Sequence, residues 1–533
     1  MNKKPLARQI GATMMNKNPL EFMLTPESVQ GAGAEYRTCF AEKDVVSELS
    51  SDFTLPDYYP EIRKLLRIET CVSPAGRYIG SGSVEFSGKV DYEMIYVTAD
   101  GGLASAPLGC DYAFEVPISR PENATEPFAP EMMADSAPEN VSGRVLSPRK
   151  VGIKCRLRSR VRGYCAAEYA PRVENDAKCE KLTDEILCAD GRRYMSEELT
   201  LSVQIPCETE LLTPVYGRCD TYIKDVSAAG GLVTLSGEAV LKVLCVEGGQ
   251  PTEICENIPF NCEVETDVHG DGASQDLWTA FPYVTDTDVT VEDGRISAKI
   301  TLLCCVDLHR NSPLTVIKDI YSIEGTENIK TNVIGYNTVL AAGTENVKLS
   351  QTLRPGTLQL ADDSRAVDVG GTAELESCTY ENGKISLSGR CRVTAVILTG
   401  GEYSVMEEGI PFSLSVPCAN RPEGEMEVVG RASLHGVECK IENGSASVSG
   451  NVYLSYSVLD GRSITAVKSV EIEGESAIET GITVCYPAQG QTMWSVAKKY
   501  RVPLSRLASA NDLPMSALSS PLPEGVKFVM ICK

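Results

Sequence analysis

The feature that most constrains this fold is a strand-like pattern that occurs three times along the chain. Residues 83–97, 232–246 and 384–398 are rich in alternating apolar and polar side chains on both sides of a Ser-Gly pair. The glycines of these pairs, here called the pivot glycines, are Gly88, Gly237 and Gly389. Alternation with a period of two is typical of half-buried β-strands. A repeat of about 150 residues is too long for a solenoid unit, so the pattern predicts three successive domains.

A second related strand follows each pivot glycine about sixty residues later along the chain. These segments are residues 150–157, 295–303 and 446–454. The clearest turn signals are Asn382-Gly383, Asp293-Gly294 and Asp460-Gly461, which favour antiparallel hairpins. A glycine inside a strand marks a bulge or a close approach of the backbone. We therefore expect a mainly-β chain with three tandem β-sandwich-like domains, each a pair of packed sheets.

One helix is predicted before the strands of the first copy, in residues 55–67. Pro60 suits the first turn of a helix, where its missing N–H costs nothing. Ile62, Leu65 and Leu66 would then form one apolar face.

The C-terminal residues have a different pattern, which predicts a small α+β module. Thr492 is a suitable N-cap for a helix because its hydroxyl can accept from the free amides of the first turn. The apolar face of this helix has the spacing i, i+3, i+4, i+7 and comprises Met493, Val496, Ala497 and Tyr500. Leu504, Leu507 and Ala508 predict a second helix. Residues 482–486 and 526–531 supply two strands, which gives the order βααβ.

Charge is unevenly distributed between this module and the rest of the chain. The net charge is −23, but residues 486–533 contain six basic and two acidic side chains, or +4. The remainder therefore has 44 basic and 71 acidic residues, or −27. Such an acidic chain is a poor partner for nucleic acid, whose phosphates need clustered Lys and Arg. The difference in sign suggests that the module meets a different surface from the rest.

Targeting signals are not evident, and we expect a cytoplasmic protein with no membrane span. Residues 1–24 have no unbroken apolar stretch behind Lys3, Lys4 and Arg8, unlike a secretory signal. No segment approaches the roughly 20 apolar residues of a membrane helix.

Cysteine is abundant, with 20 residues, yet no Cys-x-x-Cys pair occurs and histidine is limited to three residues. We therefore predict no metal site and no cofactor. Cysteines such as Cys155, Cys245, Cys304 and Cys391 lie in apolar strand-like runs and suit small buried side chains. Oxidative cross-linking in an assembled layer is the alternative, and composition leaves both open.

Catalysis is not predicted, and we name no catalytic residue. His269, His309 and His435 lie beside expected turns rather than next to a nucleophile or a carboxylate set. The chain has no Gly-x-Ser-x-Gly elbow, phosphate-binding loop or dinucleotide fingerprint. These observations favour a non-enzymatic protein.

The first repeat resembles a known family. Leu-Pro-Asp at residues 55–57 and Pro-Glu-Ile at 60–62, followed by a strand, Ser-Gly and a strand, resemble the spore-coat-associated SPOCS domain of endospore-forming bacteria. This resemblance divides the chain into an N-terminal extension, three SPOCS-like repeats and a C-terminal module. The ranges are 1–35, 36–170, 171–323, 324–480 and 481–533.

The C-terminal module resembles a LysM domain. The matching residues are Gly490-x-Thr492-x-Trp494, Ala497-x-x-Tyr500, Val502, Leu507 and Ala510-Asn511. LysM domains generally bind N-acetylglucosamine glycans between two loops. The resemblance places that groove at Gly490, Gln491, Thr492, Met493, Asn511, Asp512, Leu513 and Pro514. This chain departs from the pattern at Gln491, which replaces a frequent Asp, in the long segment 514–522, and at Ile531-Cys532.

A partner can be predicted from the module's charge and from the domain arrangement. Lys498 and Lys499 should point outward from the first helix and could dock an acidic protein, although a solvated basic face is the simpler interpretation. Three SPOCS-like repeats before one LysM-like module are similar to the SipL-type family of spore-coat morphogenetic proteins. That resemblance implies a scaffold in the mother-cell cytoplasm, at the forespore surface, that binds a SpoIVA-like coat ATPase. The alternative is a protein anchored to peptidoglycan or a chitin-type glycan through its LysM-like module.

Overall fold

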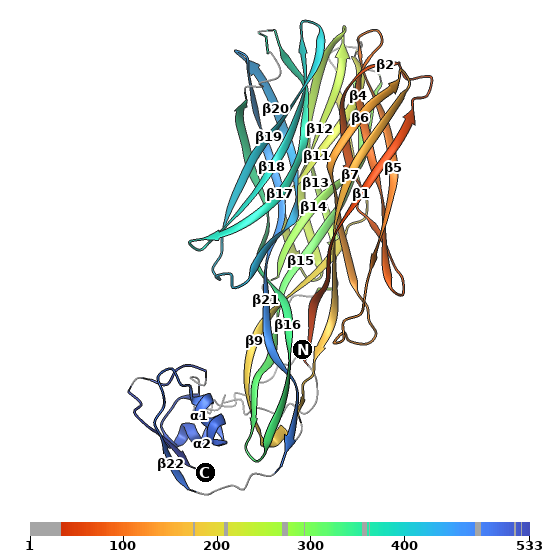
Figure 1. Cartoon of the computed structure of the whole chain (residues 1–533). Helices are drawn as coiled ribbons and strands as arrows, with labels where there is room; N and C mark the ends of the chain where they lie inside the picture. Colours follow the sequence, from red (N-terminus) through yellow and green to blue (C-terminus); the bar gives the residue numbers. More distant parts are fainter. Residues whose placement is uncertain are drawn as a thin grey trace, which may run out of the picture.

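The computed structural model describes residues 34–173, 176–206, 212–268, 276–292, 294–353, 360–361, 363–474, 481–515, 519–523 and 525–532. Most of these residues lie in antiparallel strands, and the α-helices are two short ones near the C-terminus. The prediction of a mainly-β chain is therefore confirmed. Figure 1 shows a large bundle of strands that run along the long axis of the molecule and narrow toward the C-terminal module.

The first unit consists of two sheets that face each other. One has the order β1-β7-β6, and in the other β4 pairs with β2, β3 and β5. Buried side chains from both sheets, among them Val84, Phe86, Ile153 and Leu157, form a common core. The strands are β1 (Ala34–Thr54), β2 (Ile62–Val72), β3 (Gly76–Ile79), β4 (Ser83–Thr98), β5 (Leu103–Pro117), β6 (Glu131–Ser147) and β7 (Lys150–Tyr169).

The second unit repeats this pairing. Its sheets have the orders β10-β15-β14 and β11-β12-β13, and β9 pairs with the far end of β15. Side chains of both sheets again share one core. The strands are β9 (Cys179–Met195), β10 (Leu199–Pro206), β11 (Leu212–Ala229), β12 (Leu232–Glu247), β13 (Gln250–Glu265), β14 (Leu277–Glu292) and β15 (Arg295–Ser322).

The third unit has the orders β16-β21-β20 and β17-β18-β19, and Ala373 opposite Ala432 joins the two sheets along one side. Two short elements, β8 (Arg172–Val173) and a 3₁₀ turn (Asp176–Lys178), link the first two units, and β8 pairs with β21. The strands are β16 (Thr326–Leu353), β17 (Arg365–Glu381), β18 (Lys384–Thr399), β19 (Glu402–Pro417), β20 (Glu425–Glu442) and β21 (Ser445–Glu473).

Each pivot glycine makes room for an aromatic ring on the neighbouring strand. Gly88 is opposite Tyr112, Gly237 is opposite Phe260, and Gly389 is opposite Phe412. A Cβ atom at any of the three glycines would overlap the facing ring. The expected close approach of the backbone is found at Gly237, next to Tyr222 O, and at Gly389, next to Glu374 O, whereas the nearest atoms at Gly88 belong to the Tyr112 side chain. The facing ring explains why glycine is needed in all three units.

The three units close into a ring. Strand β5 contacts β11, β13 contacts β17, and β19 contacts β2, so each unit touches both others. A hydrogen bond crosses each junction: Ser105 to Val215 O, Arg365 to Gln250, and Lys64 to Tyr403 O. At the centre, equivalent side chains of the three units pack together, in two sets: Leu66, Val215 and Val367, and Ile95, Leu244 and Val396.

A narrow stalk extends from the ring. It consists of the paired ends of β9 and β15 and of β16 and β21, which continue beyond their sheets (Figure 1). Near the base of the stalk, Tyr36 and Tyr169 of the first unit pack against Leu314, Val316 and Ile334. The stalk is thus anchored by all three units.

The predicted helix at residues 55–67 is wrong. Residues 57–59 form a turn, and β2 begins at Ile62. The register of β2 against β4 shifts between Ile62 and Lys64 and again between Leu65 and Arg67. Each shift inserts an extra residue, so the strand's apolar spacing imitates the spacing of a helix.

The turn predictions had different outcomes. Asn382 and Gly383, with φ of 50° and 78°, form the expected tight turn between β17 and β18. Gly294 lies in a turn, whereas Asp293 is outside the described residues. The prediction of a turn at Asp460-Gly461 is wrong, because both residues lie within β21. Buried Asp460 instead accepts hydrogen bonds from the backbone amides of Glu423 and Gly424.

The cysteines in apolar runs are buried, as predicted. Cys155, Cys245, Cys304 and Cys391 are all 0% exposed. Cys155, Cys304 and Cys391 are free thiols, and Cys207 lies outside the described residues. Neither of the two helices in the described part of the chain is long and apolar enough to cross a membrane.

Candidate functional site

The tail module, defined here as residues 481–532, has the order strand, helix, helix, strand. Strands β22 (Ile482–Cys485) and β23 (Val529–Cys532) pair antiparallel, and the helices are α1 (Met493–Tyr500) and α2 (Leu504–Ala510). One face of the two-stranded sheet packs on both helices. The shared core contains Cys485, Met493, Trp494, Val496, Leu507, Val529 and Ile531.

Thr492 fixes the start of α1. Its hydroxyl accepts a hydrogen bond from the Ser495 amide at 3.1 Å, and the Ser495 hydroxyl accepts one from the Thr492 amide at 3.1 Å. This reciprocal pair is a capping box, and removal of such a cap costs about 1 kcal/mol. The predicted binding residue Thr492 therefore has a structural role, as does Met493, which is 2% exposed in the core.

Asn511 seals the outer edge of β23. Its side-chain amide donates to Met530 O at 2.7 Å and to Leu507 O at 2.8 Å. Its side-chain oxygen accepts from the Met530 amide at 2.6 Å. The side chain thus occupies the backbone groups that a third strand would need, and its own polar atoms are already hydrogen-bonded.

The remaining predicted loop residues differ in exposure. Gly490, Asp512 and Pro514 are exposed, whereas Leu513 packs against the module's core. Gln491 accepts from the Ala488 amide at 3.0 Å through its side chain. Its backbone oxygen accepts from the Leu522 amide at 2.9 Å, and Thr492 forms a bridge with Pro521. The first predicted loop is therefore held by the long segment after α2.

Helix α1 faces the stalk through Asp319 of β15. The Trp494 indole donates to Asp319 Oδ2 at 2.8 Å, and Lys498 forms an ion pair with Asp319 Oδ1. The Tyr321 ring packs edge to face on Trp494, with ring centroids 5.1 Å apart. Tyr321 is also 0% exposed and donates to Val502 O at 2.6 Å. The indole and the ammonium group therefore share a single carboxylate.

Two more acidic side chains hold the module. Arg501, which ends α1 with φ of 55°, pairs with Glu327 at 2.7 Å. Glu180 accepts from the Leu504 amide at the start of α2 at 3.1 Å. The opposite charges of the module and the rest of the chain thus meet within the same chain. The prediction that both lysines of α1 point outward is wrong for Lys498, which pairs with Asp319 of the stalk. Lys499 is exposed.

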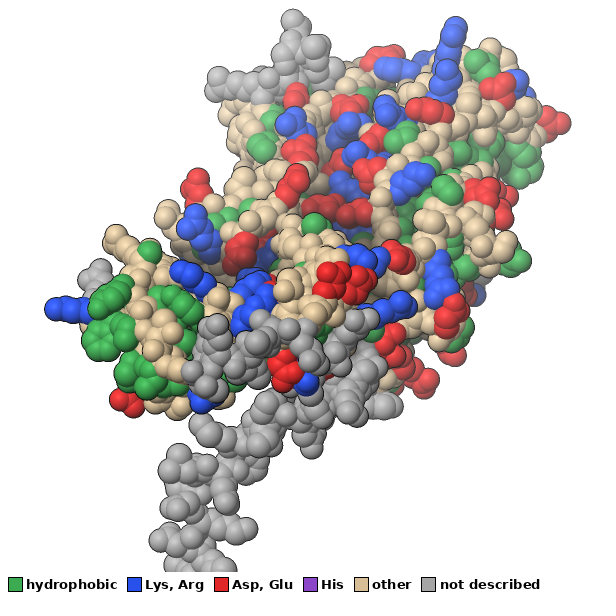
Figure 2. Space-filling view, turned by 60° about the horizontal axis from the view of Figure 1, so that its bottom comes forward, with side chains coloured by type: hydrophobic (Ala, Val, Ile, Leu, Met, Phe, Trp, Pro, Cys, Tyr) green, Lys and Arg blue, Asp and Glu red, His purple; other side chains and the backbone are tan. Residues whose placement is uncertain are grey.

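The outer face of the module's sheet is apolar and uncovered by the described residues. Five large side chains lie on it, namely Ile482, Val484, Tyr486, Phe528 and Met530. Ile482 is 74% exposed and Tyr486 is 78% exposed. Val484 and Met530 are cross-strand partners, so the set forms one continuous surface, here called the apolar sheet face. Figure 2 shows hydrophobic side chains gathered on this module, beside Lys and Arg side chains.

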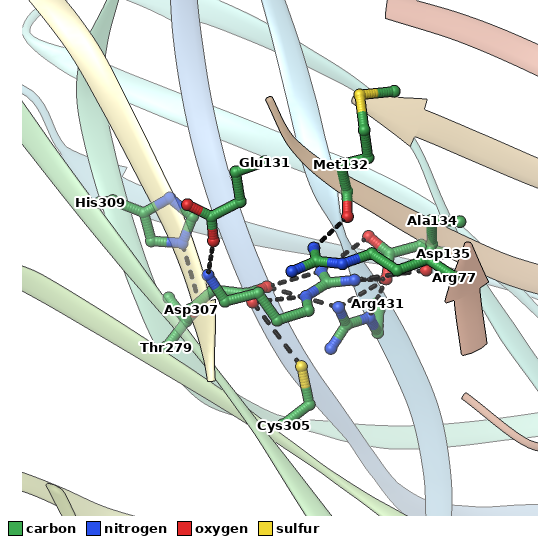
Figure 3. A network of polar contacts seen from close by, with 11 residues as sticks. Arg77, Glu131, Met132, Ala134, Asp135, Thr279, Cys305, Asp307, His309 and Arg431 are labelled. Carbon is green, nitrogen blue, oxygen red and sulfur yellow. Dashed lines mark hydrogen bonds and ion pairs between the residues drawn. The ribbon is translucent and has the colours of Figure 1, made fainter. Parts of the chain in front are cut away.

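A second concentration of polar groups lies inside the ring, where four charged side chains from all three units meet (Figure 3). Arg193 of β9 contacts both oxygens of Asp307 in β15, at 2.7 and 2.9 Å, and Asp135 of β6 at 3.1 Å. Arg431 of β20 donates to Asp135 at 2.8 Å and contacts Asp307 at 3.3 Å. These four side chains, here called the central ion cluster, are between 11% and 22% exposed.

Burial and charge together set the protonation states around this cluster. Burial alone would raise the pKa of Asp307, but Arg193 and Arg431 hold it well below its usual value. Burial lowers the pKa of the neighbouring His309 to about 4. His309 lies within β15 and contacts the Thr279 hydroxyl at 3.0 Å, and His435 lies within β20. The expectation that these two histidines lie beside turns is therefore wrong, and His269 lies outside the described residues.

A cavity of about 710 Å³ lies between the three units, next to this cluster. Its charged lining residues pair with one another: Arg158 contacts Glu139 at 3.2 Å, and Arg218 contacts Asp220 at 3.3 Å. Side chains of both charges therefore line the cavity. No group of three His, Cys, Asp or Glu side chains that could hold a metal occurs in the described part of the chain.

The tail module is therefore the stronger candidate, although sequence reasoning missed two of its features. The alternation of Ile482, Val484 and Tyr486 was visible in the sequence, but it could not show that helices cover only the opposite face. The role of Asp319 had no sequence signal, because the residue lies 175 positions from Trp494. In the comparisons with known proteins, no family model, curated protein or solved structure matches the chain.

Proposed function

We propose that this chain is a non-enzymatic scaffold of endospore-coat assembly, with three SPOCS-like β-sandwich repeats and a LysM-like module. It would act in the mother-cell cytoplasm at the forespore surface, as the resemblance to the SipL-type family implies. The tail module would dock on a SpoIVA-like coat basement-layer protein, and the ring would present other coat components.

The hydrogen bonds that the module's loop residues form within the module support a protein partner rather than a sugar. A glycan groove needs free polar groups, since discrimination among sugars depends on hydrogen bonds. Here the side chains of Thr492, Gln491 and Asn511 bind other parts of the module. The backbone oxygen of Gln491 is also bonded, to Leu522. The exposed surface is instead apolar and basic, as in many protein interfaces.

The test compares two probes with the full chain: a purified SpoIVA-like ATPase and purified peptidoglycan. We expect saturable binding to the ATPase and no cosedimentation with the glycan. Lys499→Glu should weaken binding to the ATPase roughly threefold to tenfold, mainly through slower association, because an exposed charge steers encounter. Lys440→Glu, at an exposed lysine of the third unit, is the matched control. Retention on peptidoglycan alone would replace this proposal with the glycan-anchored alternative.

A further inference from the structure

Two adjacent features of the tail module have no partner within the module's own fold. One is the apolar sheet face, and the other is the outer edge of β22. In the described part of the chain, β22 pairs with β23 and with no other strand. Alternate backbone N–H and C=O groups of an edge strand point away from its partner and are available to another strand.

The two edges of this small sheet are not equivalent. Asn511 occupies the backbone N–H and C=O of Met530, so β23 is closed to strand addition. No such side chain caps the backbone of Ile482 or Val484 among the described contacts. A strand added to this sheet would therefore join at β22, and every second side chain would extend the apolar sheet face.

Charge indicates the composition of such a strand. The exposed charged side chains described in the module are Lys499, Arg506 and Lys527, against one acidic residue, Asp512. Lys527 directly precedes Phe528, so a positive charge borders the apolar sheet face. Figure 2 likewise shows basic side chains beside the hydrophobic ones on the module. The complementary segment would alternate apolar and acidic residues.

The module's orientation leaves this surface accessible. Asp319, Glu327 and Glu180 hold α1 and the start of α2 on the stalk. The apolar sheet face lies on the other side of the sheet from these helices, because the alternate residues Cys485, Val529 and Ile531 point into the core. A partner can therefore approach without displacing the stalk.

We propose that the tail module binds an extended acidic–apolar segment of a protein partner by strand addition to β22. Because the backbone groups of Met530 point to Asn511, those of its cross-strand partner Val484 point to the free edge, as do those of Ile482. The backbone of Ile482 and Val484 supplies the hydrogen bonds, and the side chains of Ile482, Val484 and Tyr486 supply the apolar contacts. This mode gives affinity through the main chain and specificity through alternate side chains. The proposal deepens the proposed docking on a basement-layer protein and rests on it for the partner's identity.

The test uses the full chain and a fluorescent nine-residue peptide of alternating Glu and Val, read by fluorescence anisotropy. A Lys-Val peptide of equal length is the charge control. We expect the Glu-Val peptide to bind at least about tenfold more tightly than the Lys-Val peptide, a difference of 1.4 kcal/mol. Amide hydrogen exchange should show protection at β22 on binding.

Variants separate the two faces of β22. Val484→Asp places an acid on the apolar sheet face at a half-exposed position and should reduce binding of the Glu-Val peptide about tenfold or more, a change of at least 1.4 kcal/mol. Thr483→Asp, on the same strand but the opposite face, should reduce it less than about threefold by charge repulsion alone. Unchanged circular dichroism and melting temperature establish that both variants fold. Equal losses for the two variants would overturn the proposal.

The same variants distinguish this proposal from the proposed function and from other occupants. If the SpoIVA-like ATPase binds Val484→Asp as tightly as the natural chain, the docking surface is wrong while the function stands. If only the peptide binds, the surface stands and the partner is wrong. Stronger peptide binding after deletion of residues 1–33 would assign the surface to the chain's own N-terminus. A dimer that Val484→Asp dissolves would assign it to a second copy, and either result overturns the proposal.

Discussion

Two junctions hold this molecule together, and they differ in how much water reaches them. The central ion cluster joins the three units through Asp135, Arg193, Asp307 and Arg431, which are at most 22% exposed. The junction between stalk and tail rests on Asp319 and Lys498, which are 30% and 32% exposed. Ion pairs weaken as solvent screens them, so we expect the ion pair of the second junction to contribute less to stability than those of the first.

The largest expected effect comes from removing one partner of the buried junction. Arg431→Ala leaves Asp135 and Asp307 with only Arg193, and such an uncompensated buried charge costs about 3–5 kcal/mol. Urea unfolding followed by far-ultraviolet circular dichroism measures the loss. Lys330→Ala is the control, because its pair with Glu471 is exposed and should contribute less than about 1 kcal/mol. Equal losses in the two variants would contradict the comparison.

Lowering the pH should reduce the stability of the ring and change that of the tail little. Burial lowers the pKa of His309 to about 4, below the unfolded value near 6.5, so the unfolded chain takes up the proton first as the pH falls. The ring therefore loses stability between pH 6.5 and about 4, on the order of 3 kcal/mol for this residue. His435, with a pKa of about 4, adds a loss of the same sign.

The chain offers a spectroscopic way to follow this difference. Its two tryptophans are Trp278 in β14, next to the strand of His309, and Trp494 in the tail, and residues 481–533 contain no histidine. We expect His309→Asn to flatten the pH dependence of ring unfolding. The stability of Trp494's surroundings should change little over the same range in a Trp278→Phe background. An undiminished pH slope in His309→Asn would reject this assignment.

The smallest expected effect is the release of the tail. Asp319→Ala removes the acceptor of the Trp494 indole and the partner of Lys498, a loss of about 2 kcal/mol in docking. The tail should then leave the stalk more readily while ring unfolding shifts by less than about 0.5 kcal/mol. Acrylamide quenching of Trp494 in the Trp278→Phe background reports release, which added salt should increase.

Asp184→Ala is the matched control, since Asp184 pairs with Lys318 next to Asp319 but does not touch the tail. Unchanged quenching in Asp319→Ala would mean that apolar packing of Tyr321 alone fixes the module.

Local signals in the sequence were informative where neighbours along the chain decide the structure. The Thr492 cap and the spacing from Met493 to Tyr500 predicted α1, because a short helix depends on its own first turn. The pivot glycines predicted a bulge or a close approach of the backbone, and an aromatic ring, which was not predicted, also lies against the glycine in each unit. At residues 62–67 the same reasoning failed, because bulges set by pairing with β4 changed the apolar spacing.

Contacts between distant residues could not be predicted in this way. The direction of Lys498 depends on Asp319, 179 residues earlier, and the ring depends on junctions between separate units. Sequence repetition indicated three similar units but contained no information on how they pack. The candidate site was therefore placed on the two loops of the LysM-like groove and on Lys498 and Lys499 of α1, rather than on the apolar sheet face.

Closure of the ring requires all three units, so parts of the first two units stay exposed while the chain is being synthesised. Arg67 of the first unit pairs with Asp368 of the third, 301 residues later. At about 5–20 residues per second, a ribosome needs roughly 15–60 s to add that stretch. During this time the first unit exposes the side that β19 later covers, and the second exposes the side that β17 later covers. The nascent chain is thus open to premature association until the third unit is made, and a chain truncated after the second unit stays in that state.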